Sequence, residues 1–204
     1  LIYHGVSEYL KKIKNDEINI KNFNNYILYP SMIHYYKNQI EVFKAYENFI
    51  REFPRGPDLI FAGKGDDNYL RKLKFIVNNS KISDKVFILE NVPFKSMPVF
   101  YRKAQFIVFA SMSENCPNIL LESLSFGKAI LCSKKFPMPE FGGKNVVYFD
   151  GNSIDELSSK LKLFFKNPNI VRTYEKKALV HSKNFDGKIS ALKTWNYLVY
   201  NATK

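Results

Sequence analysis

The chain is poor in several residue types, and each scarcity excludes a class of protein. Its 204 residues include only two cysteines, Cys116 and Cys132. A disulfide framework and a paired-cysteine metal site are therefore not expected, and a reducing compartment is the simpler interpretation. The three histidines, His4, His34 and His181, lack metal-ligand spacing, so we expect no bound metal and no required cofactor.

Long apolar runs and a secretory signal are also missing. No run approaches the roughly 20 apolar residues that span a bilayer, and the first residues lack a charged start, an apolar stretch and a cleavage site. We therefore expect a cytoplasmic location. Because the chain does not begin with Met, we expect it to be part of a longer protein.

Arginine is scarce although the chain is strongly basic. The formal net charge is +12, from 31 basic and 19 acidic residues, but only five of the basic residues are arginine. Such a charge favours acidic partners. Because the basic residues are dispersed and lysine lacks the bidentate fork of arginine, a solvated lysine-rich surface is the main interpretation. Peripheral contact with an anionic membrane, at the inner face of the plasma membrane, remains an alternative. Nucleic acid is not an expected partner, because arginines clustered with stacking aromatics are missing.

Apolar residues are plentiful, at 46% of the chain, which is ample for a core. They form six short continuous runs, a pattern typical of strands buried on both faces. The predicted strands are Tyr26–Tyr29, Leu59–Ala62, Val86–Leu89, Phe106–Phe109, Ala129–Cys132 and Val146–Phe149.

Segments with helical periodicity lie between most of these runs. Gly127 is expected to end one of them as a C-cap, and Ser153 to start another with Glu156 in a capping box. Predicted helices cover Asn38–Phe53, Asp67–Asn79, Ser96–Lys103, Asn118–Phe126, Ser153–Phe165, Asn169–Lys183 and Lys188–Tyr200.

Alternating strands and helices predict an α/β fold. We expect a Rossmann-like parallel sheet of about six strands with helices on both faces, over residues 23–150. Residues 151–204 would form a helical tail, and residues 1–22 a hinge or linker. In such sheets the ligand lies beyond the carboxyl ends of the strands, so the residues after each run are candidates.

The first candidate segment runs from Pro30–Ser31 to Lys37, where a long helix is predicted to begin. A cation at a helix N-terminus is unfavourable by about 0.3–1 kcal/mol, and such conflicts collect at functional sites. An anion bound there would contact both the lysine and free backbone N–H groups. An exposed lysine near a frayed helix end is the alternative.

The second candidate is the turn Gly63-Lys64-Gly65-Asp66-Asp67. Two glycines without the third of a dinucleotide fingerprint are a weak signal. A tight turn before an Asp-capped helix is the main interpretation, and close approach of the backbone to a ligand is the alternative.

The third candidate is Ser113–Glu122, which contains two glutamates. Pro117 suits the first turn of a helix, which would place Glu114 in the preceding loop and Glu122 in the second turn. Helical side chains lean toward the N-terminus, and residues 118 and 122 are separated by roughly 6 Å of rise. Glu122 is therefore expected to face the same cleft as Glu114.

Two other interpretations of the glutamates stay open. They could be surface residues that happen to lie eight apart, or paired carboxylates for hydrolysis. Hydrolysis ranks low because one acid lies on a loop and one on a helix beside helix-end amides, which favours a polyhydroxylated anionic ligand. Cys116 lacks the partner base of a catalytic thiol.

Several segments in order resemble a known family. The stretch FIVFASMSENCPNILLESLSFGKAIL contains the E-x7-E element of retaining GT-B glycosyltransferases of the family-four, group 1 type. YPS through Lys37-Asn38 resembles the phosphate-binding entry of that family, FAGKGDD its Gly-x-Gly turn, and MPEFGG followed by VVYFD its Pro-Glu turn and final strand. YHGVS resembles the hinge at which its C-terminal domain begins.

The resemblance implies a role for each matching residue. Glu122 would bind the ribose hydroxyls of a nucleotide-sugar and Glu114 the hydroxyls of its sugar, while Lys37 would neutralise the departing diphosphate. Catalytic roles would thus fall to Glu114 and Lys37. The other implied donor-binding residues are Ser31, Gly63, Gly65, Asn115, Cys116, Asn118 and Ile119.

The implied activity is retaining transfer of a sugar from a UDP- or GDP-sugar to a polysaccharide or lipid-linked acceptor. The nucleotide-sugar is the donor substrate, and no cofactor is required. The acceptor domain, which precedes this one in the family, is absent from the sequence, so the chain alone is expected to be inactive. The chain departs from the family at Ser31-Met32, where a Gly-Arg pair is usual, and in the hinge at His4 and Ser7. A sugar-nucleotide epimerase and a basic Rossmann-like nucleic-acid module are the alternatives.

Overall fold

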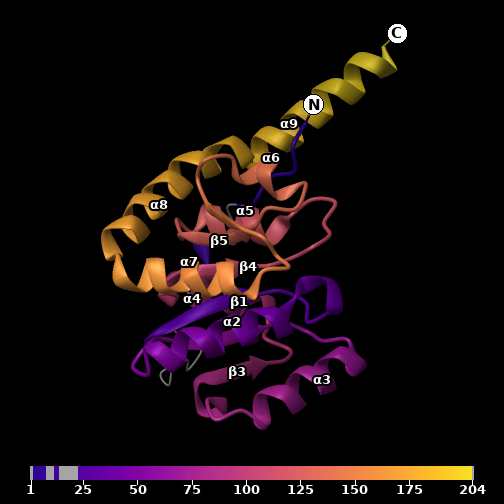
Figure 1. Cartoon of the computed structure of the whole chain (residues 1–204). Helices are drawn as coiled ribbons and strands as arrows, with labels where there is room; N and C mark the ends of the chain where they lie inside the picture. The colour runs from indigo at the N-terminus through magenta and orange to yellow at the C-terminus, as the bar shows by residue number, and fades with distance from the viewer. Residues whose placement is uncertain (1, 8–11, 14–22, 204) are drawn as a thin grey trace.

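The computed structural model describes residues 2–7, 12–13 and 23–203, and a six-stranded parallel sheet forms its centre (Figure 1). The strand order is β3-β2-β1-β4-β5-β6. All six predicted strands are confirmed, with ends shifted by one residue at most. The strands are β1 (Tyr26–Pro30), β2 (Asp58–Ala62), β3 (Val86–Leu89), β4 (Ile107–Phe109), β5 (Ile130–Ser133) and β6 (Val147–Phe149).

Burial explains why the strand sequences are continuous rather than alternating. Every residue of β1, β4 and β5 is buried, because helices cover both faces of these central strands. The edge strand β3 has one buried residue, Val86, and the edge strand β6 also has one, Phe149.

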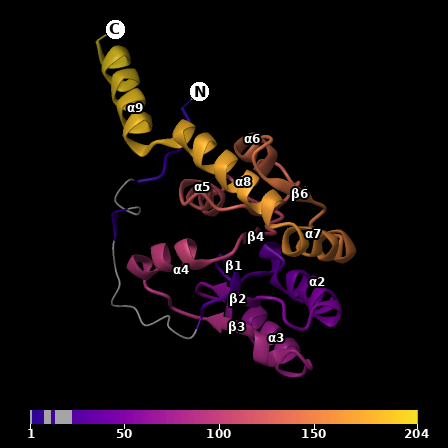
Figure 2. The same ribbon diagram turned by 90° about the vertical axis from the view of Figure 1, so that its left-hand side faces the viewer.

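Helices lie on both faces of the sheet, as predicted. Figure 2 shows α2, α3 and α7 on one side and α4 and α5 on the other. The helices are α2 (Gln39–Glu52), α3 (Asp67–Asn78), α4 (Met97–Lys103), α5 (Asn118–Ser125), α6 (Met138–Gly142), α7 (Ile154–Lys166), α8 (Pro168–His181) and α9 (Gly187–Ala202). Short 3₁₀ turns cover Tyr35–Lys37, Ser83–Lys85, Phe94–Ser96 and Ser182–Phe185.

The predicted caps are partly right. Gly127 follows α5 with a left-handed φ of 63°, and its N–H donates to the Leu124 carbonyl at 2.9 Å. The Glu156 N–H donates to Ser153 Oγ at 3.1 Å, but the Glu156 carboxylate accepts from the Asp150 N–H at 2.8 Å. The capping box is therefore wrong in its second half, because the chain entering α7 places Asp150 within reach of Glu156. The segment predicted as a Pro-Glu turn also contains the short helix α6.

Residues 2–7 attach to the C-terminal part of the domain. The Val6 N–H donates to the Phe185 carbonyl at 2.8 Å, and the Gly187 N–H donates to the Val6 carbonyl at 3.1 Å. The Tyr3 ring packs edge-on against Phe141 and Phe185, with centroids 5.4 and 5.8 Å apart. Residues 8–11 and 14–22 of the predicted hinge lie outside the described residues.

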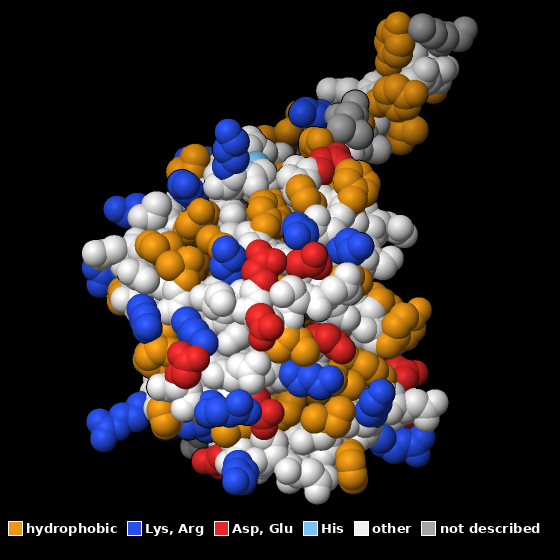
Figure 3. All heavy atoms as spheres, in the orientation of Figure 1, with side chains coloured by type: hydrophobic (Ala, Val, Ile, Leu, Met, Phe, Trp, Pro, Cys, Tyr) orange, Lys and Arg blue, Asp and Glu red, His pale blue; other side chains and the backbone are white. Residues whose placement is uncertain are grey.

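Helix α9 projects from the domain (Figures 1 and 2) and contains no buried residue. Its exposed apolar residues include Leu192, Trp195 and Leu198. Within the described ranges, no helix combines the length and the apolar character needed to cross a membrane. On the face seen in Figure 3, basic side chains are scattered among acidic, polar and apolar ones.

Removing residues 191–204 is expected to change the free energy of unfolding by less than about 1 kcal/mol, because residues 191–203 are all exposed. The measurement is urea denaturation. Phe164→Ala is the contrasting variant, since Phe164 is 1% exposed and its truncation is expected to remove about 3–5 kcal/mol. A truncated chain as unstable as that variant would contradict the prediction.

Candidate functional site

The strand order changes direction between β1 and β4. These strands are neighbours, with Leu28 paired to Ile107, yet β2 and β3 extend the sheet on one side and β5 and β6 on the other. Loops leaving such a switch point diverge and open a crevice at the carboxyl edge of the sheet. The first and third candidate segments follow these two strands, so the fold brings them together.

The loop after β1 is held against the loop after β2. The Ile33 N–H donates to the Lys64 carbonyl and the Asp66 N–H to the Ile33 carbonyl, both at 2.9 Å. The chain then forms the 3₁₀ turn Tyr35–Lys37, passes through Asn38 with a left-handed φ of 56°, and enters α2 at Gln39. Lys37 therefore lies two residues before the long helix, in a fixed turn.

Lys37 is buried and paired. Its residue exposure is 7%, and its ammonium donates to the Glu114 carboxylate. The ammonium also lies 5.0 Å from the Tyr36 ring centroid and 5.7 Å from that of Phe109. These contacts rule out an exposed lysine at a frayed helix end. They also show that Glu114 offsets the charge of Lys37.

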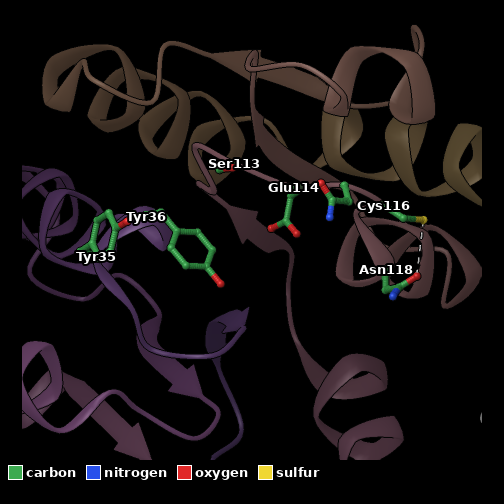
Figure 4. A pocket seen from close by; sticks show the side chains of 7 residues that line it. Tyr35, Tyr36, Ser113, Glu114, Cys116 and Asn118 are labelled. Carbon is green, nitrogen blue, oxygen red and sulfur yellow. Dashed lines mark hydrogen bonds between the residues drawn. The ribbon is translucent and has the colours of Figure 1, made fainter.

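Glu114 lines a cavity of about 570 Å³ between the loops after β1 and β4 (Figure 4). The Asn118 N–H at the start of α5 donates to the Cys116 carbonyl at 2.9 Å, and Pro117 occupies the N-cap position. The cavity is lined by Tyr35, Tyr36, Ser113, Glu114, Asn115, Cys116 and Asn118.

Glu122 lies one turn into α5 and is partly buried. Its carboxylate accepts a hydrogen bond from the Tyr101 hydroxyl at 2.8 Å, and the Tyr101 ring stacks on Phe126 with centroids 4.9 Å apart. Burial raises the pKa of the Glu122 carboxyl above its ordinary value, and the hydrogen bond from Tyr101 opposes this shift. One carboxylate oxygen of Glu122 is therefore fixed by Tyr101.

Glu122 borders two cavities, of about 230 and 250 Å³. The 230 Å³ cavity shares Asn118 with the cavity at Glu114, and it shares Phe94 with the 250 Å³ cavity. The three cavities therefore adjoin along the carboxyl edge of the sheet, and the two glutamates face adjoining cavities. The 230 Å³ cavity is otherwise lined by His4, Gly5, Val6 and Ser7, and the 250 Å³ cavity by Pro30, Ser31, Met32, Ala62, Gly63, Val92, Met97, Tyr101 and Ile119.

The two glycines of the second candidate segment are required by the protein itself. A Cβ at Gly63 would lie 2.2 Å from the Ser31 carbonyl oxygen, and one at Gly65 would lie 2.8 Å from the Leu70 side chain. Asp66 caps α3 by accepting from the Tyr69 N–H at 3.0 Å. The tight turn before an Asp-capped helix is thus present, and Gly63 in addition lines the 250 Å³ cavity.

Cys116 has the properties of an unreactive thiol. Burial raises the pKa of Cys116, and the negative charge of Glu114 raises it further. A nucleophilic cysteine requires the opposite shift. Both cysteines are free.

Several residues of the site were missed from the sequence. Tyr101 gave no signal, because only the tertiary structure brings it to Glu122. Val92 and Phe94 read as ordinary apolar residues before α4, and Met97 as an ordinary apolar residue at its start. Tyr35 and Tyr36 had a signal that could have been used, since they directly precede Lys37 in a polar loop. Among the described residues, no group of three or more His, Cys, Asp or Glu could hold a metal ion.

Comparison with known proteins decides the family. Residues 11–194 match the profile described as glycosyl transferases group 1. The chain belongs to this family. This match confirms the predicted group 1 glycosyltransferase family. The predicted Rossmann-like fold is confirmed by solved structures that share the architecture of this chain.

Two solved structures illustrate the shared fold. Anabaena Alr3699/HepE, in complex with UDP and glucose, superposes with a TM-score of 0.82 at 17% identity, over 98% of this chain and 56% of its own. The C-terminal domain of a glycosyl transferase group 1 family protein (LpcC) from Francisella tularensis has a TM-score of 0.72 at 15% identity, over 89% of this chain and 94% of its own.

A curated relative shows what one similar protein does. The N-acetylgalactosamine-N,N'-diacetylbacillosaminyl-diphospho-undecaprenol 4-alpha-N-acetylgalactosaminyltransferase of Campylobacter jejuni is 26% identical over 166 residues, which are 76% of this chain and 43% of that enzyme. This glycosyltransferase chain thus spans less than half the length of that curated relative.

Proposed function

We propose that this chain is the donor-binding part of a glycosyltransferase, and that the three adjoining cavities hold a nucleotide-sugar. The observation that carries the proposal is the arrangement of Glu114, Lys37 and Glu122 at the switch point of the sheet. The carboxylates of Glu114 and Glu122 can accept hydrogen bonds from sugar hydroxyls, and they flank the buried Lys37 and the start of α5. This arrangement suits a ligand with hydroxyl groups at both ends and a diphosphate between them.

The nucleoside is assigned to the 250 Å³ cavity. Its lining is mainly apolar, including Val92 and Phe94, which suits a nucleobase. Glu122 at its edge would accept from the ribose hydroxyls with the carboxylate oxygen that Tyr101 leaves available. Because a solved protein of the same fold holds UDP and glucose, we take a UDP-sugar as the first candidate donor and a GDP-sugar as the second.

The diphosphate and the sugar are assigned to the start of α5 and the 570 Å³ cavity. Amides of Asn115, Cys116 and Ile119 would donate to phosphate and sugar oxygens, and Glu114 would accept from the sugar hydroxyls. Ser31 and Gly63, at the ends of β1 and β2, would lie beside the nucleotide. Lys37 would divide its positive charge between Glu114 and the arriving diphosphate.

The proposed chemistry is electrostatic stabilisation of a leaving group. As the bond from the anomeric carbon to the β-phosphate oxygen breaks, negative charge grows on the diphosphate. Lys37 and the α5 amides are positioned to stabilise that charge, and Glu114 to orient a sugar with oxocarbenium character. The oxygen of the acceptor hydroxyl bonds to the anomeric carbon, and its proton passes to the departing diphosphate. We propose retention of configuration, as the E-x7-E resemblance implies.

The acceptor side is proposed from relatives alone. A lipid-linked acceptor is the leading choice, because the Campylobacter jejuni relative is named for a diphospho-undecaprenol substrate. A polysaccharide acceptor is the alternative. The acceptor would bind through a part of the protein beyond this chain, and the basic surface would add peripheral contact with an anionic membrane.

Glu122→Gln is expected to weaken UDP binding at least about 10-fold, because a charge-assisted hydrogen bond contributes roughly 1.5–3 kcal/mol. Glutamine keeps an acceptor for Tyr101, so the fold around α5 should survive. The measurement is titration calorimetry of the chain with UDP, with GDP and ADP as comparisons.

The matched control is Glu52→Gln, which removes an exposed carboxylate at the end of α2 and should leave UDP affinity unchanged. Thermal melting of each variant separates loss of binding from loss of folding. Equal UDP affinity in the wild-type and Glu122→Gln chains would contradict the assignment of Glu122, and no binding of any nucleotide at millimolar concentration would contradict the donor site.

A further inference from the structure

The 570 Å³ cavity has two chemically different walls. One wall carries polar groups from the loop after β4 and from the first residue of α5, among them Glu114, Asn115 and Asn118. The other is formed by Tyr35 and Tyr36 from the 3₁₀ turn after β1 (Figure 4). Tyr35 is 69% exposed. Exposed aromatic side chains that line a cavity commonly mark a binding surface.

The tyrosine wall is held in place before any ligand arrives. The His34 ring contacts both tyrosines, with centroids 4.6 Å from Tyr35 and 4.5 Å from Tyr36. The two tyrosine rings pack edge-to-face at 5.6 Å. The carbonyl of Tyr36 accepts from the Met112 N–H at 2.8 Å, which ties this turn to the loop after β4.

Through its contacts with Lys37, Tyr36 lies beside the position proposed for the sugar of the donor. The Lys37 ammonium lies 5.0 Å from the Tyr36 ring centroid while it donates to Glu114. In Figure 4 the Tyr36 ring lies between Tyr35 and Glu114. A group bound to the Glu114 carboxylate within this cavity would therefore lie close to the Tyr36 ring.

A hexopyranose has complementary surfaces to these walls. Its hydroxyls radiate around the ring edge and suit carboxylate and amide partners, whereas its C–H groups form an apolar face. C–H groups pack favourably on aromatic rings, whose faces carry negative charge density. Nucleotide and diphosphate have no such apolar face at this end, so an aromatic wall here discriminates the sugar.

We propose that Tyr36, supported by Tyr35 and His34, is the stacking surface for the sugar of the donor and helps to select which sugar is accepted. The inference rests on the proposed donor site, and it adds a specificity-determining side chain that the E-x7-E pattern does not contain. Tyr36 positions the sugar by packing and takes part in no bond change.

The test compares two ligands on the same variant. Tyr36→Leu is expected to weaken the binding of a UDP-sugar at least about 5-fold while changing UDP affinity less than about 2-fold, since only the sugar touches the ring. Titration calorimetry is run with UDP, UDP-glucose, UDP-galactose, UDP-N-acetylglucosamine and UDP-N-acetylgalactosamine, and the tightest UDP-sugar is used for the comparison.

Two further variants complete the design. Tyr36→Phe keeps the ring and is expected to bind the UDP-sugar within about 2-fold of the wild type. Tyr197→Leu is the matched control, because Tyr197 is 63% exposed on α9, away from the cavity. It should change neither affinity.

The outcomes separate the two proposals. Suppose that the wild-type chain binds UDP. If Tyr36→Leu then weakens the binding of UDP and of the UDP-sugar equally, or changes neither affinity, the stacking role is overturned and the donor site stands. If the wild-type chain binds no nucleotide at millimolar concentration, the donor site fails and the stacking role fails with it. Selective loss of the UDP-sugar, with recovery in Tyr36→Phe, supports the stacking role.

Discussion

Lys37→Met is expected to lower the free energy of unfolding by about 3–5 kcal/mol, the usual cost of removing one partner from a buried ion pair. The side chains of Lys37 and Glu114 are 8% and 13% exposed. Without the ammonium, the Glu114 carboxylate would remain in a poorly hydrated place with no opposite charge. Urea denaturation at neutral pH measures the loss.

A comparison within the chain isolates the effect of burial. Lys74 also pairs with a glutamate, Glu90, but these side chains are 42% and 35% exposed. Lys74→Met is therefore expected to cost no more than about 1 kcal/mol. The double variant Lys37→Met with Glu114→Gln should recover part of the loss, because no unpaired charge is left. Equal effects of Lys37→Met and Lys74→Met would show that water screens the Lys37 pair.

The proposed catalytic role of Lys37 depends on the same contact. The buried pair holds the Lys37 ammonium against Glu114, a residue that lines the 570 Å³ cavity. A lysine held in this way requires little reorganisation when charge develops on a diphosphate. An apolar pair at these two positions could give the domain equal stability. The proposed role of Lys37 in stabilising charge on the diphosphate would explain why an ion pair is found there instead.

Gly63→Ala is expected to destabilise the domain by about 3 kcal/mol, at the upper end of the usual cost of overpacking. Its Cβ would lie 2.2 Å from the Ser31 carbonyl oxygen, so the ends of β1 and β2 would have to separate. The hydrogen bond from the Ser31 N–H to the Ala62 carbonyl, at 3.0 Å, would be disturbed as well. Thermal and urea unfolding measure the change in stability.

Gly127→Ala is the matched glycine variant. A Cβ there has its nearest neighbour at 3.5 Å, so the cost is limited to the left-handed φ of 63°, about 1 kcal/mol. A chain in which Gly63→Ala is no less stable than Gly127→Ala would show that the strand ends can move apart freely. UDP affinity should fall only in Gly63→Ala, because Gly63 lines the 250 Å³ cavity.

The sequence by itself determined the elements and the class of fold. Continuous runs such as Ile107–Phe109 are buried on both faces, and this burial fixes their composition. The stripe that includes Val42, Tyr46 and Phe49 on α2 is likewise buried. Burial against the sheet thus produces the hydrophobic pattern from which strands and helices can be predicted. The alternation of strands and helices in turn predicted parallel strand pairing. Strand ends also identified the three candidate segments.

Only the tertiary structure decided how those segments meet. Lys37 and Glu114 are 77 residues apart, and Tyr101 and Glu122 are 21 apart on different helices. Such pairs depend on strand order and helix packing, which no local period encodes. The pairing of β1 with β4 at the switch point brings Lys37 to Glu114, leaves Tyr36 on the cavity wall, and assigns the two glutamates to adjoining cavities. Residue types could be read from the sequence, whereas their contacts arise from long-range packing of the sheet.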